Sequence, residues 1–117
     1  MGKDLLESLL SELRRGTLIL CVLSQMQDSC YGYALVQALN ERGISVDANT
    51  LYPLLRRLEN QGLLGSEWDT SESKPRKYYK RTAYGSQIYA ELAAQWKTMS
   101  AGIQNLIEGS SGGTDSI

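Results

Sequence analysis

The sequence predicts a mainly α-helical chain with one small β-hairpin. Apolar residues recur at helical spacing through most of the chain, and the leucines at positions 51, 54, 55 and 58 form one such stripe. Two segments, 64–69 and 76–81, have the pattern of strands instead. Two helices separated by a short link come directly before these strands, which is the order of a winged helix-turn-helix. We therefore expect that fold, with N- and C-terminal dimerisation helices added to it.

The composition excludes several classes of protein. The chain has 117 residues, enough for one domain with an appended helix. It contains no histidine, which is the commonest general base and metal ligand. Its two cysteines, Cys21 and Cys30, lack the spacing of a metal or redox motif, and no glycine-rich phosphate loop occurs. We expect no enzyme activity, no cofactor and no metal.

Charge and hydropathy indicate where the protein acts. No apolar segment has the length of a membrane span, and charged residues interrupt the N-terminal leucines, unlike in a signal peptide. We expect a cytoplasmic protein that does not bind membranes. The net charge of −1 counts slightly against nucleic-acid binding. Five cations and no acid lie between positions 74 and 81, however, so the positive charge is concentrated.

The first predicted helix covers residues 4–26. Gly16 could break this segment into two helices, but a single glycine costs a helix only about 1 kcal/mol, so we expect one long helix that can bend there. Leucines form a stripe along its first half, before the compact domain begins. These leucines either pack inside the monomer or form a dimer interface, and we expect Leu5, Leu6 and Leu9 at the interface.

Two more helices follow the first. A turn at 27–29 precedes a helix over 31–41, which Gly43 ends. After a short extended link, the next helix is predicted to start with Asn49 as its N-cap and to stop at Gly62.

This third helix has polar groups opposite its leucine stripe. Asn49, Tyr52, Pro53 and Arg56 lie on that face, with Arg57 at its edge. Amide and guanidinium groups on an exposed helix bond base edges in the major groove, and arginine also binds phosphate. The alternative is an ordinary solvated face, which any amphipathic surface helix has.

The predicted hairpin places cations beside this helix. Its loop, 70–75, is polar and contains a proline, and its second strand is rich in aromatic residues and cations. Such a wing would contact the sugar-phosphate backbone or an adjacent minor groove. The alternative is that the cations are simply solvated. They are Lys74, Arg76, Lys77, Lys80 and Arg81.

The last predicted helix begins after Thr82, its N-cap, and runs for about two dozen residues. A small winged domain cannot cover such a helix, so we expect a second copy to bury the remainder by two-fold symmetry. The residues expected in this interface are Leu92, Trp96, Met99 and Ile103. The chain then divides into 1–82, the DNA-binding domain with the N-terminal helix; 83–108, the dimerisation helix; and 109–117, a flexible Gly/Ser-rich tail.

Five short motifs together resemble the PadR family of bacterial transcriptional regulators. They occur in the order and at the spacing of that family, over about residues 13–85, and the presence of a single helix after the hairpin is similar to its smaller subfamily. The motifs are Leu13-Arg14-Arg15-Gly16-Thr17-Leu18, Tyr31-Gly32-Tyr33-Ala34-Leu35, Asn49-Thr50-Leu51-Tyr52-Pro53-Leu54-Leu55-Arg56-Arg57-Leu58-Glu59, Gly62-Leu63-Leu64 and Pro75-Arg76-Lys77-Tyr78-Tyr79.

The resemblance implies a dimer that represses transcription by occupying a double-stranded DNA operator. The DNA-binding residues expected from the motifs and from the charge pattern are Asn49, Thr50, Tyr52, Pro53, Arg56, Arg57, Lys74, Arg76 and Lys77. Some drug-sensing members hold flat aromatic ligands against a tryptophan of the last helix, between the subunits. Trp96 lies at the matching position, so it either binds a small aromatic effector or is a plain residue of the dimer core.

The chain departs from the family pattern at one position. Arg81 stands where these regulators usually have a leucine, which implies a looser strand end or an additional phosphate contact. An alternative function is also open, namely a winged-helix adaptor that binds proteins and never DNA. The slight excess of acids favours this alternative.

Overall fold

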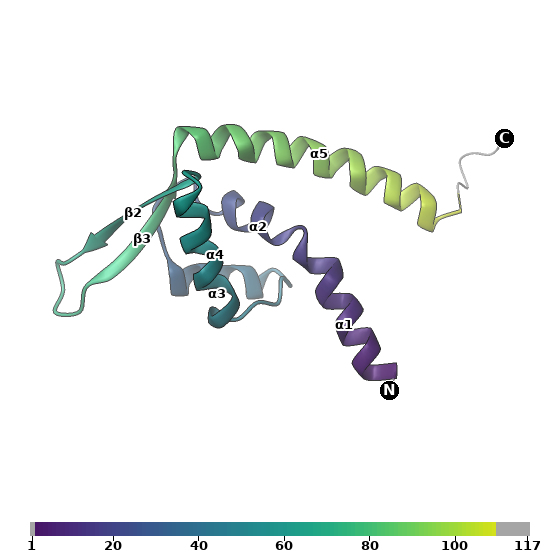
Figure 1. The fold of residues 1–117 in the computed structure, drawn as a ribbon, viewed down its shortest axis with the longest axis horizontal. Helices are drawn as coiled ribbons and strands as arrows, with labels where there is room; N and C mark the ends of the chain where they lie inside the picture. The colour runs from purple at the N-terminus through teal and green to yellow at the C-terminus, as the bar shows by residue number, and fades with distance from the viewer. Residues whose placement is uncertain (1, 110–117) are drawn as a thin grey trace.

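The computed structural model describes residues 2–109. The elements follow one another as α1 (Gly2–Arg15), α2 (Leu18–Ser24), β1 (Cys30–Tyr31), α3 (Gly32–Glu41), α4 (Ala48–Asn60), β2 (Leu64–Asp69), β3 (Arg76–Arg81) and α5 (Ala83–Ile107) (Figure 1). The expected tail at 109–117 lies outside the described residues apart from Gly109.

The leucine stripe of α4 forms the centre of the core. Leu51, Leu55 and Leu58 are fully buried, and they pack with Leu23 of α2 and Leu35 of α3. This confirms that the spacing of the leucines placed one face of α4 inward. The opposite face of α4 is therefore available for other contacts.

Both ends of α4 are fixed by local hydrogen bonds. The N-cap is Asp47, whose carboxylate accepts the Thr50 N–H at 2.9 Å. The prediction of Asn49 as N-cap was wrong, because Asp47 already has the extended backbone of a cap and Asn49 lies within the first turn. Gly62 has a positive φ of 82°, and the next N–H bonds Leu58 O at 2.9 Å, which confirms Gly62 as the C-terminal stop.

The N-terminal region contains two helices, so the prediction of one long helix was wrong. The chain leaves helical geometry at Gly16 and Thr17, where the Thr17 N–H and Oγ1 both bond Arg14 O. The threonine hydroxyl competes with the next helical turn, which a glycine alone would not do. As a result α1 points away from the core and has no buried residue, whereas α2 packs inside (Figure 1).

The sheet has a third strand that the sequence did not predict. Its order is β1-β3-β2, all antiparallel, with Cys30 opposite Tyr79 and Tyr31 opposite Tyr78. The helix predicted over 31–41 therefore starts one residue later, at Gly32. Two residues of strand are too short to show a period in the sequence. The strands predicted at 64–69 and 76–81 are confirmed.

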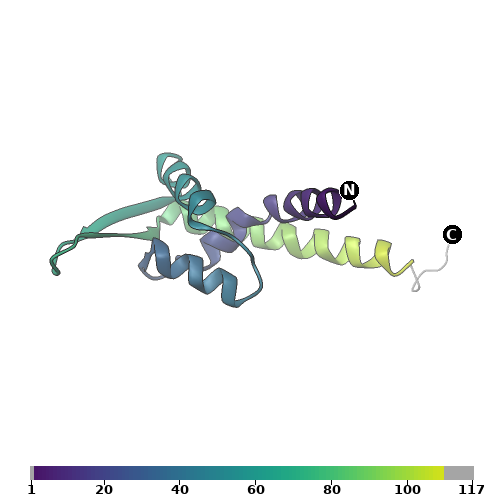
Figure 2. The same cartoon turned by 90° about the horizontal axis from the view of Figure 1, so that it is seen from below.

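The last helix, α5, contacts the core through its first half, and its second half projects away from the core. Thr82 caps α5 by accepting the Gly85 N–H at 2.9 Å, as predicted. The first half of α5 packs on α2, and the rest projects beyond the core on the same side as α1 (Figures 1 and 2). The whole is a mainly α-helical winged helix-turn-helix, in which β2, β3 and their loop form the wing, residues 64–81. Within the described residues, no helix is long and apolar enough to cross a membrane.

Candidate nucleic-acid interface

The outer face of α4, defined here as Asn49, Pro53 and Arg56, is exposed as predicted. Thr50 and Arg57 are exposed beside it. A helix that is backed by buried leucines and presents amide and guanidinium groups has the chemistry for contacting base edges.

Tyr52 does not belong to the exposed outer face, contrary to expectation. It is half-buried, and its ring packs against the core and over Gly32 at the start of α3. A Cβ at Gly32 would overlap this ring, so the glycine leaves the space that the tyrosine fills. Tyr52 is thus only partly exposed, where it lines the hollow described next.

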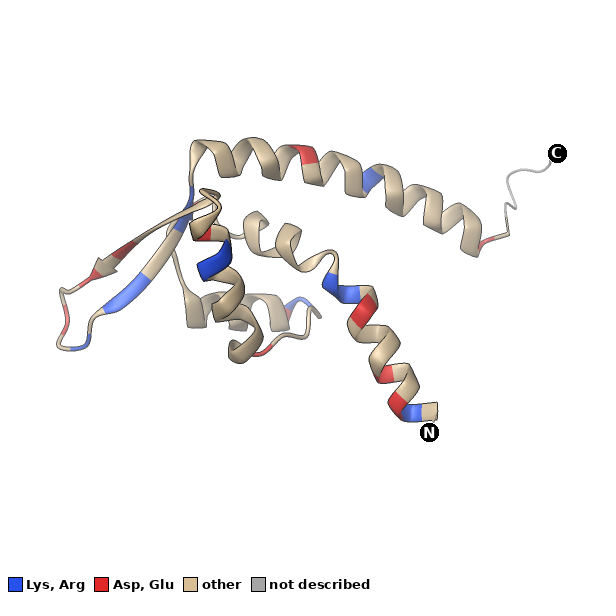
Figure 3. Ribbon diagram, viewed as in Figure 1, with Lys and Arg blue, Asp and Glu red and all other residues tan. Residues whose placement is uncertain are grey.

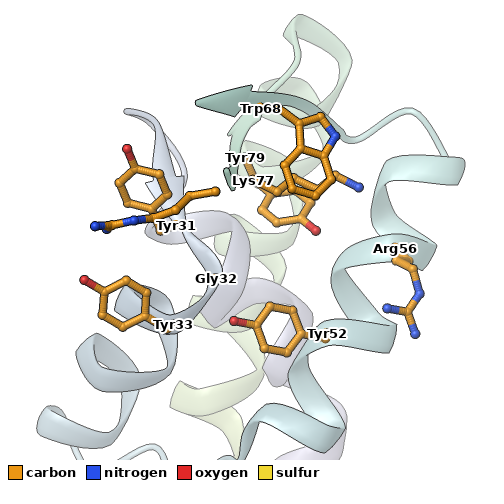
Figure 4. A pocket seen from close by; sticks show the side chains of 9 residues that line it. Tyr31, Gly32, Tyr33, Tyr52, Arg56, Trp68, Lys77 and Tyr79 are labelled. Atoms are coloured by element: carbon orange, nitrogen blue, oxygen red, sulfur yellow. The ribbon is translucent and has the colours of Figure 1, made fainter. Parts of the chain in front are cut away.

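A hollow of about 410 Å³ lies between α4, the wing and the start of α3 (Figure 4). In Figure 4, the ring of Tyr52 extends from α4 toward the tyrosines at the start of α3, and Trp68 and Tyr79 close the hollow on the wing side. We call this space the wing–helix hollow. It is lined by Tyr31, Gly32, Tyr33, Tyr52, Arg56, Trp68, Arg76, Lys77 and Tyr79.

Sequence reasoning missed five of these lining residues, namely Gly32 and four aromatic residues. Tyr31, Tyr33, Trp68 and Tyr79 come from segments that are far apart in the chain, and the antiparallel pairing of β3 with both β1 and β2 helps to bring them together. The one signal available in the sequence is the high aromatic content of the Tyr-Gly-Tyr motif and of the hairpin.

The wing carries fewer free positive charges than its sequence suggests. Arg76 forms an ion pair with Glu72 at 3.0 Å, and Lys77 forms one with Glu59 of α4 at 3.3 Å. Figure 3 shows acids and cations side by side along the wing. Lys74 is exposed in the loop. The cation run from 74 to 81 contains no acid in sequence, but the fold brings acids from other segments to it.

Aromatic rings hold the two paired cations at the edge of the hollow. The Arg76 guanidinium lies 5.2 Å from the centre of the Tyr31 ring, and the Lys77 ammonium lies 5.4 Å from that of Tyr79. At these distances the ring faces attract the cations. Both side chains are therefore kept in place before any ligand arrives.

Hydrogen bonds keep the neighbouring acids ionised. The Tyr31 hydroxyl donates to the Asp69 carboxylate at 2.6 Å, and together with bonds from Ser71 this lowers the pKa of Asp69 to about 2. A hydrogen bond from the Ser66 hydroxyl, and then the contact with Lys77, lower the pKa of Glu59. These carboxylates are therefore fully charged at neutral pH and offset part of the positive charge of the wing.

Arg81 points into the protein, contrary to the expected phosphate contact or loose strand end. Its guanidinium donates to Leu23 O at 2.9 Å and lies 4.4 Å from the centre of the Tyr89 ring. Its backbone N–H also bonds Met26 O at 2.9 Å. The arginine thus joins the end of β3 to α2 and α5, because its long stem can pack like leucine while its head still finds partners.

The residues expected at a dimer interface are largely exposed in the single chain. Leu5, Leu6 and Leu9 on α1 are 62%, 55% and 54% exposed. On α5, Trp96, Met99 and Ile103 are exposed and Leu92 is half-buried. Within the described residues, no group of acids and cysteines is placed to hold a metal.

An apolar cleft of about 660 Å³ separates α5 from the end of α1 and the start of α2. Trp96, Leu92, Met99 and Ile103 line its α5 side, and Leu13 lies on the other side. All four of these α5 residues were predicted to lie in the dimer interface, and Trp96 was also predicted to contact an effector.

Comparisons with known proteins agree with this architecture. Residues 19–91 match the model of the transcriptional regulator PadR-like family. A transcriptional regulator of Mycobacterium tuberculosis is 36% identical over 81 residues, which make up 68% of this chain and 76% of that protein.

Solved structures agree as well. The crystal structure of a PadR family transcriptional regulator from Eggerthella lenta matches with a TM-score of 0.83 and 53% identity, over 92% of this chain and 96% of that one. The PadR of Bacillus subtilis, crystallised in complex with operator DNA, shares the fold with a TM-score of 0.62 and 21% identity, over 66% of this chain and 45% of that one.

Proposed function

Because this chain belongs to the PadR-like family of transcriptional regulators, we propose that it binds a double-stranded DNA operator as a homodimer and represses transcription there. Residues 1–82 would bind DNA and residues 83–108 would pair the two copies. The PadR of Bacillus subtilis, which has the same fold, was crystallised with operator DNA.

One observation above all supports DNA binding by this chain. The exposed outer face of α4 stands next to the wing, and the wing–helix hollow lies between them. A helix in a major groove places the backbone of one DNA strand beside the helix, where a wing can touch it. In this arrangement Asn49 and Arg56 would contact bases, while Lys74, Arg76 and Lys77 would lie near phosphates.

The two paired wing cations would exchange partners on binding. Lys77 would leave Glu59 for a phosphate, and Arg76 would do the same with Glu72. The ion pair of Arg76 is exposed and that of Lys77 half-buried. Exposed pairs contribute little stability, so phosphate can replace at least the acid on Arg76 at small cost.

A pair of substitutions tests this assignment. Lys77→Ala should weaken binding to every DNA sequence alike and reduce the salt dependence of the affinity, by a slope of about 0.9 for each phosphate that is no longer neutralised. Arg56→Ala should instead narrow the difference between operator and random DNA, because the exposed guanidinium is assigned to a base edge. If both variants bind an operator as tightly as the wild type, the assigned residues are wrong.

The exposed apolar faces of α1 and α5 support the dimer. Isolated large apolar side chains are common on surfaces, but two long helices with continuous exposed stripes need a partner. A second copy of the same chain, related by two-fold symmetry, would bury both stripes at once.

The apolar cleft supports a small aromatic effector that relieves repression. Its volume of about 660 Å³ suits a small ligand, and the indole of Trp96 offers a flat surface for stacking. Fluorescence of Trp96 in a Trp68→Phe background should change on titration with flat aromatic cations or with phenolic acids. Unchanged emission across both series would leave Trp96 as a residue of the dimer core.

A protein-binding adaptor is the second candidate, favoured by the net charge of −1 and by the acids along the wing. A gel shift with DNA from the region upstream of its own gene distinguishes the two functions. Absence of a shift at low salt, with a folded dimer, would favour the adaptor.

A further inference from the structure

A groove on the side of α4 away from the wing adds a second contact with DNA. We propose that Arg15, at the end of α1, binds a DNA phosphate there together with Arg57 of α4. This inference rests on the proposed DNA binding and assigns a role to a residue outside the helix-turn-helix and the wing.

Two opposite flanks of α4 border the outer face. Tyr52 and Arg56 line the wing–helix hollow on one flank. On the other flank, Thr50, Pro53 and Arg57 follow one another at i, i+3 and i+7, and so lie along one side of the helix. They line a groove of about 330 Å³ whose facing wall includes Arg15.

The local structure holds Arg15 at this groove. α1 ends at Arg15, and the hydrogen bonds from Thr17 to Arg14 O fix the turn that follows. Leu18 and Ile19 then pack against the core and line the same groove as Arg15. The break between α1 and α2 therefore places Arg15, the last cation of α1, beside α4.

The charges favour phosphate on this flank. The cations on the wing side, Arg76 and Lys77, already have acid partners. Among residues 2–109 neither Arg15 nor Arg57 forms an ion pair, and both are exposed. Figure 3 shows positive segments on the wing, on α4 and at the end of α1. Near the outer face, cations without an acid partner are therefore found on α4, at the end of α1 and in the wing loop.

The acid that caps α4 lies near this site, and Glu12 precedes Arg15 by three positions on α1. Asp47 borders the neighbouring groove with Arg15, where its carboxylate caps α4 by accepting the Thr50 N–H. Its negative charge disfavours phosphate at the N-terminal end of α4. The phosphate would therefore lie between Arg15 and Arg57, nearer the middle of the helix.

With this contact, the outer face of α4 lies between two cationic flanks. A helix in a major groove has a DNA backbone on each side, and the wing and Arg15 would each meet one of them. Because phosphate contacts do not depend on sequence, Arg15 would add affinity and salt dependence without adding base specificity.

The test measures the salt dependence of binding to a random-sequence duplex and to a duplex from the region upstream of the gene. Arg15→Gln should weaken binding to both and lower the salt slope by about 0.9 for each Arg15 engaged. Arg15→Lys should keep the slope, since a charge is retained. Lys3→Gln is the matched control: it removes the same charge from an exposed site on α1, about 18 Å from Arg15 along the helix axis.

The outcomes separate this inference from the proposed function. If the wild type binds neither duplex, DNA binding itself is wrong. If the wild type binds both duplexes but Arg15→Gln matches Lys3→Gln in affinity and slope, the phosphate contact is overturned. A loss of binding that Arg15→Lys does not restore, or that accompanies dissociation in light scattering, would also overturn it, because Arg15 would then serve packing or assembly.

Discussion

At the scale of single residues, Arg81 shows how a change in side-chain type alters contacts without altering the fold. The position has an arginine where the resemblance to the family led us to expect a leucine, and the backbone of β3 still pairs normally there, opposite Leu64. The guanidinium lies over the Tyr89 ring and donates to Leu23 O. Its Nε atom is buried and has no hydrogen-bond partner within the described residues, which reduces the stability that the side chain contributes.

We predict that Arg81→Ala lowers the free energy of unfolding by about 1–3 kcal/mol, because it removes both the packing of the stem and a charged hydrogen bond. Arg81→Leu should cost less than about 1 kcal/mol, because it keeps apolar packing and removes the unpaired Nε together with its charge. Urea unfolding followed by circular dichroism, at equal protein concentrations, measures both. Equal losses for the two variants would contradict the packing role of the stem.

At the scale of elements, the junction between α4, the wing and α5 sets the direction of the last helix. The Thr82 hydroxyl donates to Gly62 O at 2.6 Å, and the Thr82 N–H bonds Leu63 O at 3.1 Å. Gly85, in the first turn of α5, lies directly against the Leu63 carbonyl, and a Cβ there would overlap that backbone. The start of α5 is therefore held by the end of the helix-turn-helix.

We predict that Gly85→Ala destabilises the protein by about 3 kcal/mol, because a backbone carbonyl cannot move aside as a flexible side chain can. Gly102→Ala in the same helix is the control. A Cβ at Gly102 meets nothing within 4 Å in the chain, so this change should stabilise α5 by about 0.5–1 kcal/mol. Thermal unfolding of the two variants gives opposite shifts if the junction is as tight as described.

At the scale of the whole molecule, the exposed stripes on α1 and α5 are what the single chain leaves unburied. The core is small, and both projecting helices lie on the side away from the wing (Figure 2). An assembly that joins two chains through these helices would leave both outer faces of α4 free for DNA.

We predict that Ile103→Glu makes the protein monomeric by abolishing the proposed dimer, because a charge cannot be buried in an apolar interface without a partner. Ala94→Glu is the matched control, since Ala94 is exposed on the opposite side of α5. Light scattering coupled to size exclusion gives the mass. Ile103→Glu should also lose operator binding, since a dimer contacts two half-sites. A dimeric Ile103→Glu variant would contradict the assigned interface.

Local patterns alone determined most of the secondary structure. Several signals act over only a few residues, so they are visible in the chain itself. They are the leucine spacing of α4, the glycine at position 62, the alternation of side chains in β2 and the cap at Thr82. The motifs were equally sufficient for the family, which the comparisons confirm. The N-cap at Asn49 and the single helix over 4–26 were wrong because Asp47 and Thr17 offered competing hydrogen bonds of similar local quality.

Tertiary structure alone decided which side chains meet. Three features join segments that are 18 to 58 positions apart in the chain. They are the ion pair between Lys77 and Glu59, the cluster of tyrosines around the wing–helix hollow, and the contacts that Arg81 makes inside the protein. No periodicity encodes such contacts, because they depend on how whole elements pack and on which partner is nearest after packing. The sequence therefore determined which elements form and which family they belong to, while the packing of those elements decided which charges of the candidate interface remain free.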